Sequence, residues 1–133
     1  MDKKTLDLLK GYLAKAEEKL RVAKTLLKNE GYDDCVSRAY YCAFHAAQAL
    51  LLTEGFSANT HQGVLNFFGL NFVKTGRFDR KFGKILSTLK DERENGDYEI
   101  YSAIDEEVAK VAVKEAEDFL KEARHYLNKY LKG

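Results

Sequence analysis

The segment Ser37–Leu51 is apolar around most of a helix and yet carries four polar side chains on one face. Its alanines and aromatic residues predict a central helix that is buried on several sides. The polar residues recur at steps of three, four and three positions, which lines them up: Arg38, Tyr41, His45 and Gln48. Because unpaired polar groups are costly inside a protein, this stripe either forms a structural hydrogen-bond network or lines a functional groove.

The rest of the chain has the composition of an all-helical protein. Proline is absent, and alanine, leucine, lysine and glutamate are plentiful, so we expect one all-α domain over residues 1–133. Apolar spacing predicts an up-and-down antiparallel bundle of about five helices, three long and two shorter. The formal net charge of +1 does not by itself indicate a nucleic-acid partner. The predicted helices cover about residues 5–30, 35–53, 61–72, 80–95 and 106–130.

Capping residues predict where these helices begin and end. Glycine after a helix favours termination, so we expect Gly31 and Gly96 to end the first and fourth helices. Short polar side chains before a helix accept hydrogen bonds from its first free N–H groups. The predicted N-caps of the second to fifth helices are Asp33 or Asp34, Asn59 or Thr60, Asp79, and Asp105.

The two cysteines indicate a reducing environment. Cys35 and Cys42 are seven positions apart on one helix, a rise of roughly 10 Å, which is too far for a mutual disulfide. Cys42 and His45 offer two zinc ligands, but no third follows at a suitable spacing, so we expect no metal and no other cofactor. The N-terminal residues lack the apolar core of a signal peptide, and no apolar run can span a bilayer. We therefore expect a cytoplasmic protein with no membrane partner.

Four motifs occur together in one order: Ser37–Ala47, Thr60–Val64, Phe72–Gly76 and Arg93–Tyr98. In these motifs the chain resembles HEPN domains, above all the small stand-alone prokaryotic ones, over about residues 5–131. The resemblance implies a helical bundle that forms a homodimer. It also implies a small nucleotidyltransferase protein as partner, in a two-gene, toxin–antitoxin-like module. An alanine-rich helix with a polar stripe is compatible with a two-fold interface.

Many HEPN proteins are metal-independent endoribonucleases, and the resemblance implies where their motif falls. That motif is an arginine, four to six residues, and then a histidine that acts as general acid or base, while the arginine neutralises the scissile phosphate. Arg93 occupies the arginine position, but Tyr98 stands where the histidine would be. A phenol with a pKa near 10 is a poor base at neutral pH. Arg38 and His45 have the right spacing on a different helix and form a fallback catalytic pair.

Further candidates concern binding and modification. The residues expected to bind a nucleotide or RNA are Arg38, Tyr41, His45, His61, Lys74, Arg77, Arg80 and Lys81. These residues also have structural alternatives. His61 either bonds locally at a helix start or approaches His45. The basic cluster is otherwise a solvated helix end and consists of Lys74, Arg77, Arg80, Lys81 and Lys84. Arg93 can pair with Asp97. The resemblance also implies that the partner nucleotidyltransferase modifies the hydroxyl of Tyr98 or Tyr101.

Three functions therefore remain open from the sequence. The first is a HEPN protein that partners a nucleotidyltransferase and binds a nucleotide or RNA in a polar groove. The second is a metal-independent endoribonuclease toxin that uses Arg93 or the Arg38–His45 pair. The third is a non-catalytic helical dimerisation scaffold. The degenerate motif leaves open whether the chain is an enzyme.

Overall fold

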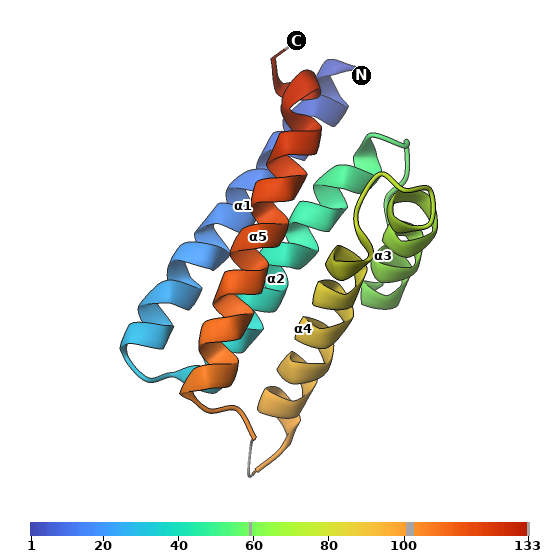
Figure 1. The fold of residues 1–133 in the computed structure, drawn as a ribbon. Helices are drawn as coiled ribbons and strands as arrows, with labels where there is room; N and C mark the ends of the chain where they lie inside the picture. Colours follow the sequence, from blue (N-terminus) through green and yellow to red (C-terminus); the bar gives the residue numbers. More distant parts are fainter. Residues whose placement is uncertain (59, 101–102, 133) are drawn as a thin grey trace.

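The computed structural model describes residues 1–58, 60–100 and 103–132. Within these residues the chain is all-α, as the sequence predicts, and contains no strand (Figure 1). The elements in chain order are α1 (Lys3–Lys28), α2 (Tyr32–Leu52), α3 (His61–Phe68), the π-helical turn η1 (Gly69–Val73), α4 (Arg80–Tyr98) and α5 (Glu106–Leu131). No helix among the described residues is long and apolar enough to cross a membrane.

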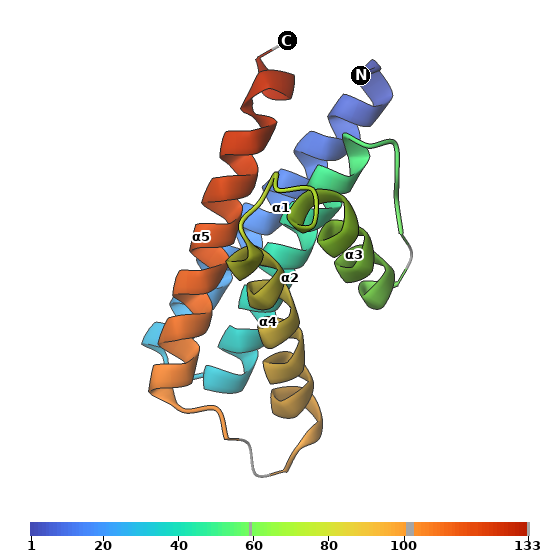
Figure 2. The same cartoon turned by 45° about the vertical axis from the view of Figure 1, so that its right-hand side comes forward.

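Helix α2 is the centre of the bundle and packs against α1, α3, α4 and α5. Its alanines at positions 39, 43, 46, 47 and 49 are fully buried, which lets the neighbouring helices approach closely. In Figure 1 and in Figure 2, α5 lies to the left of α2 and α3 to its right, and α3 still meets α5, because the Phe68 ring of α3 lies 5.3 Å from the Phe119 ring of α5. From Cys35 to Leu52, the only residues of α2 that are not buried are Ser37, Arg38, Tyr41, His45 and Gln48.

Thr60, Asp79 and Asp105 cap α3, α4 and α5, which confirms these predictions, whereas Asn59 lies outside the described residues. The stop predicted at Gly31 is right in place, since α1 ends at Lys28, but it is wrong in which residue is left-handed. Glu30 adopts the left-handed conformation with a φ of 64°, and Gly31 is the N-cap of α2. The Gly31 N–H donates to the Leu26 carbonyl at 2.9 Å, which closes the end of α1 without a left-handed glycine.

The predicted caps of the second helix and the stop of the fourth are also wrong. Asp33 and Asp34 lie inside the first turn of α2, where carboxylates favourably face the positive end of the helix dipole. Helix α4 continues through Gly96 to Tyr98. A Cβ added at Gly96 would lie 2.9 Å from Ile104 Cδ1, so this glycine permits a close approach of the chain rather than ending the helix.

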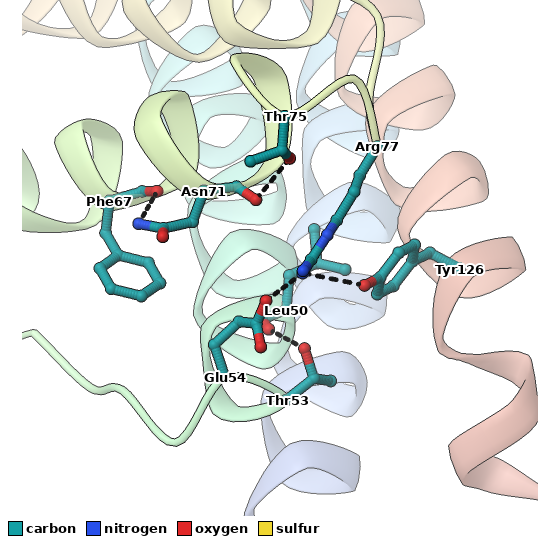
Figure 3. A network of polar contacts seen from close by, with 8 residues as sticks. All are labelled: Leu50, Thr53, Glu54, Phe67, Asn71, Thr75, Arg77 and Tyr126. Carbon is teal, nitrogen blue, oxygen red and sulfur yellow. Dashed lines mark hydrogen bonds and ion pairs between the residues drawn. The ribbon is translucent and has the colours of Figure 1, made fainter.

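The third predicted helix changes type before its end, because residues 69–73 form the wider turn η1. Such turns weaken the regular ladder, and side chains nearby replace some of its bonds. The Asn71 amide donates to the Phe67 carbonyl at 3.1 Å, and the Thr75 hydroxyl donates to the Asn71 carbonyl at 2.8 Å (Figure 3). Arg77 then joins this region to α2 and α5, because its guanidinium donates to the Glu54 carboxylate and the Tyr126 hydroxyl.

Glu92 of α4 gives the fold a pH-dependent weak point. Burial raises its pKa to about 6, and the carboxylates of Glu115 and Asp91 add to this rise. Its Oε1 atom is buried without a hydrogen-bond partner among the described residues. The folded state therefore favours the protonated acid, so stability falls as pH rises from the ordinary pKa of 4.5 through about 6.

We expect Glu92→Gln to raise the free energy of unfolding at pH 8 by about 1 kcal/mol, a value reduced from full linkage because solvent screens a half-buried carboxylate. At pH 4 the change should be close to zero, because glutamine resembles the protonated acid. Urea unfolding at the two pH values measures both effects. The exposed Glu99→Gln is the control, and an equal gain from both variants would contradict the prediction.

Candidate functional site

Three residues of the polar stripe of α2, Arg38, Tyr41 and His45, line an open groove against α1, while Gln48 lies outside this groove and hydrogen-bonds to His45. The groove has a volume of about 340 Å³. It is lined by Lys15, Lys19, Asp34, Ser37, Arg38, Tyr41 and His45. Three cations thus surround one carboxylate beside a phenol ring and an imidazole. Cations contact phosphates and ring faces stack on bases, so the groove has the chemistry of a nucleotide or RNA site.

A second set of side chains shares Tyr41 and His45 with this groove. We call this set the aromatic cluster, and it consists of Tyr40, Tyr41, Phe44, His45 and His61. His61, the first residue of α3, stacks on Phe44 with ring centroids 4.4 Å apart. Tyr41 lies 5.9 Å from the His45 ring and 5.7 Å from the His61 ring. The Phe44 ring also lies 5.8 Å from the His45 ring. The structure thus brings both imidazoles to the rings of Tyr41 and Phe44, and an approach of His61 to His45 is one of the alternatives that the sequence leaves open.

Each imidazole has one defined hydrogen-bond partner. The Tyr40 hydroxyl lies 2.8 Å from His61 Nδ1, and the Gln48 amide oxygen lies 2.8 Å from His45 Nδ1. Burial lowers the pKa of both histidines. The nearby lysines 15 and 19 lower the pKa of His45 further, and the guanidinium of Arg93 does the same for His61. Both rings therefore favour the neutral form at pH 7 in the free protein.

Arg93 of α4 reaches the aromatic cluster from the other side. Its guanidinium carbon lies 5.3 Å from the centre of the Tyr40 ring and 5.5 Å from that of Tyr41. Nη1 donates to the Asp97 carboxylate at 3.1 Å, so the predicted ion pair is present. Nε is buried without a hydrogen-bond partner among the described residues. Arg93 is therefore a structural residue that also presents an unused donor at the cluster.

Tyr98, at the position where the motif histidine would stand, is the last residue of α4, and 77% of its surface is exposed. An imidazole also lies near Arg93, that of His61, which comes from α3. The phenol of Tyr98 remains accessible to a modifying enzyme, whereas Tyr101 lies outside the described residues.

The basic cluster near the start of α4 lies apart from the groove. Arg77 is engaged by Glu54 and Tyr126 and lies 5.5 Å over the Phe72 ring. Lys81 lies 5.1 Å over the Phe82 ring and lines a separate depression that also contains Asp118 and Glu122. Lys74 and Arg80 are exposed. Opposing carboxylates thus accompany part of this cluster, as Asp34 accompanies the cations of the groove.

The cysteines are buried as thiols. Burial raises the pKa of Cys35 to about 11 and that of Cys42 to about 12, so neither is ionised at pH 7. Among the described residues, no group of three or more histidine, cysteine, aspartate or glutamate side chains is placed to hold a metal ion.

Several known proteins are similar in sequence to this chain over most of its length. The HEPN domain family model matches residues 9–126. A UPF0332 protein of Thermotoga maritima is 42% identical over 106 residues, 80% of each chain. A protein of Methanocaldococcus jannaschii named "Putative toxin MJ0605" is 39% identical over 87% of this chain and 86% of its own. A UPF0332 protein of Archaeoglobus fulgidus is 36% identical over 93% of this chain and 98% of its own. The chain therefore belongs to the HEPN domain family.

Proposed function

We propose that this HEPN protein binds RNA or a nucleotide in the groove between α1 and α2, as the partner of a small nucleotidyltransferase in a two-gene, toxin–antitoxin-like module. The groove lined by Lys15, Lys19 and Arg38 carries this proposal, because cations there surround an accessible aromatic ring. Two relatives from Methanocaldococcus jannaschii carry the names "Putative toxin MJ0605" and "Putative toxin MJ0142", which supports a module of this kind. The buried free thiols support a cytoplasmic location.

Substitution in the groove should weaken RNA binding and its dependence on salt. Arg38→Ala is expected to lower the affinity for a short single-stranded RNA by about tenfold and to reduce the salt slope by about 0.7, the value of one lost phosphate contact. Fluorescence anisotropy at several salt concentrations measures both. Lys10→Ala removes an exposed charge from α1 outside the groove and is the matched control. Equal weakening by both variants would show that binding is not located in the groove.

The partner and the assembly need separate experiments. Co-expression with a nucleotidyltransferase encoded beside this gene should yield a stable complex, and mass spectrometry should find a nucleotidyl group on Tyr98. Tyr98→Phe should remove that group, unless Tyr101 is the acceptor.

For the homodimer, sedimentation should give twice the 15.2 kDa mass of one chain. A species of one chain mass at high concentration would contradict dimerisation.

A second candidate function is the metal-independent endoribonuclease, which the two imidazoles and two guanidiniums around Tyr41 favour. Neutral imidazoles can move protons, and Arg38 and Arg93 can balance the charge of a phosphodiester in reaction. The purified protein should then cut single-stranded RNA in excess chelator and leave cyclic phosphate ends. A protein that neither binds nor cuts RNA would leave the non-catalytic dimerisation scaffold as its function.

A further inference from the structure

We propose that His61, from the start of α3, is the imidazole that works with Arg93, and that it protonates the oxygen leaving the scissile phosphate of RNA. This inference rests on the endoribonuclease function above. The motif segment Arg93–Tyr98 lacks a histidine, and the fold brings His61 near Arg93 from another helix. The resulting site is built by α2, α3 and α4 rather than by one continuous motif.

Arg93 and His61 meet at the same pair of tyrosine rings. The guanidinium lies 5.3 Å and 5.5 Å from the ring centres of Tyr40 and Tyr41. The His61 ring lies 5.6 Å and 5.7 Å from the same two centres. The Arg93 side chain is 15% exposed, so part of its guanidinium is open to a ligand. A phosphate oxygen is a strong acceptor for a guanidinium N–H, and one bound at this exposed edge would bring a phosphodiester within reach of His61.

Hydrogen bonding leaves the Nε2 atom of each imidazole for a substrate. The hydroxyl of the fully buried Tyr40 lies 2.8 Å from His61 Nδ1, so that nitrogen already has a partner. In His45, Nδ1–H donates to the Gln48 amide oxygen, which leaves the Nε2 lone pair free. His45 is thus prepared to accept a proton, and protonated His61 would donate one from Nε2.

The reaction balances with these groups alone. His45 Nε2 accepts the proton of the ribose 2′-hydroxyl, and the 2′ oxygen forms a bond to phosphorus. The bond between phosphorus and the 5′ oxygen breaks, and protonated His61 gives its Nε2 proton to that oxygen. The products are a 2′,3′-cyclic phosphate and a 5′-hydroxyl, and exchange with water restores both histidines. Arg93 and Arg38 balance the negative charge that develops on the phosphate.

His61 must be protonated before this step, and the groups around it set its pKa. From α4 it faces Arg93 and Lys90, which lower its pKa after burial, and Glu94, which raises it. From α2 it contacts Tyr40, Tyr41 and Phe44 and lies near His45. A bound phosphate anion adds a negative charge that favours the protonated ring. RNA cutting should accordingly be faster at mildly acidic pH than at pH 8.

Two substrates separate leaving-group protonation from a structural role. His61→Asn should slow cutting of RNA by about 100-fold or more, as for loss of a general acid. A ribonucleoside 3′-(4-nitrophenyl phosphate) has a leaving group that needs no proton, so its cleavage should fall by less than about threefold. His45→Asn should slow both substrates, and His125→Asn, exposed on α5, should slow neither. Circular dichroism of each variant, and of His61→Gln as a second replacement, checks that the fold persists.

Phosphate binding gives an independent readout by NMR of the histidine side chains. Inorganic phosphate should raise the pKa of His61 in the unmodified protein, and Arg93→Ala should remove that rise. Equal slowing of both substrates by His61→Asn, or no slowing of either, would overturn the role of His61 alone. A protein that cuts neither substrate would overturn this role together with the endoribonuclease function, while binding in the groove is judged separately by Arg38→Ala.

Discussion

Alanine in place of Arg93 is expected to slow RNA cutting by about 100-fold or more, because it removes the cation that we propose lies beside the reacting phosphate. Among the residues that the structure describes, Arg93 is the one guanidinium over both Tyr40 and Tyr41, and it holds these rings from the side of α4. Its loss should also cost about 0.5–2 kcal/mol of stability, the range for a cation held against aromatic rings. Rates of RNA cutting in chelator and urea unfolding measure the two effects separately.

Three further variants make this result specific. Arg93→Lys keeps the charge but loses the planar fork that stacks on rings and grips phosphate, so it should recover only part of the rate. Arg80→Ala removes an exposed arginine of the basic cluster and tests that cluster as the alternative RNA site, whereas Arg21→Ala, exposed on α1 and outside the groove, should leave cutting unchanged. If Arg80→Ala slowed cutting more than Arg93→Ala, the RNA site would be the basic cluster at the start of α4 and not the aromatic cluster.

The sequence predicts local features of this fold well, because they depend on neighbours along the chain. Apolar spacing locates five helices, and Thr60, Asp79 and Asp105 act as caps as their short polar side chains indicate. The Arg93–Asp97 pair also follows from a spacing of four on one helix. Glu30 departs from this pattern, since it adopts a left-handed conformation that propensity assigns to the adjacent glycine.

The site is only partly predictable, because it depends on how distant helices pack. The stripe of Arg38, Tyr41 and His45 is visible as a periodic pattern, and the structure places it along the groove. The approach of His61 to Tyr40 and Arg93 has no such signal, since it requires α3 and α4 to meet at the same face of α2. The placement of Thr60 as a cap puts His61 at the first position of a helix, but not beside any particular partner.

The largest expected effect on stability comes from the aromatic core that fixes α3 and α4 against α5. Phe119 of α5 is completely buried, and its ring lies 5.3 Å from Phe68 of α3 and 6.0 Å from Phe82 of α4. Phe119→Ala should lower the free energy of unfolding by about 3–5 kcal/mol, because the cavity has rings on several sides that cannot collapse into it. Such a loss is a large part of the total stability of an ordinary domain, about 5–15 kcal/mol.

Urea unfolding measures this loss, and Val111→Ala on the same helix is the control. Val111 is 54% exposed, so its truncation should change stability by less than about 0.5 kcal/mol. A loss below about 1 kcal/mol for Phe119→Ala would contradict the packing described for α3. Because the residues that line the groove of the proposed RNA site all come from α1 and α2, folded Phe119→Ala protein should still bind RNA there. Its RNA cutting should fall, since a loosened α3 no longer holds His61 against Tyr40.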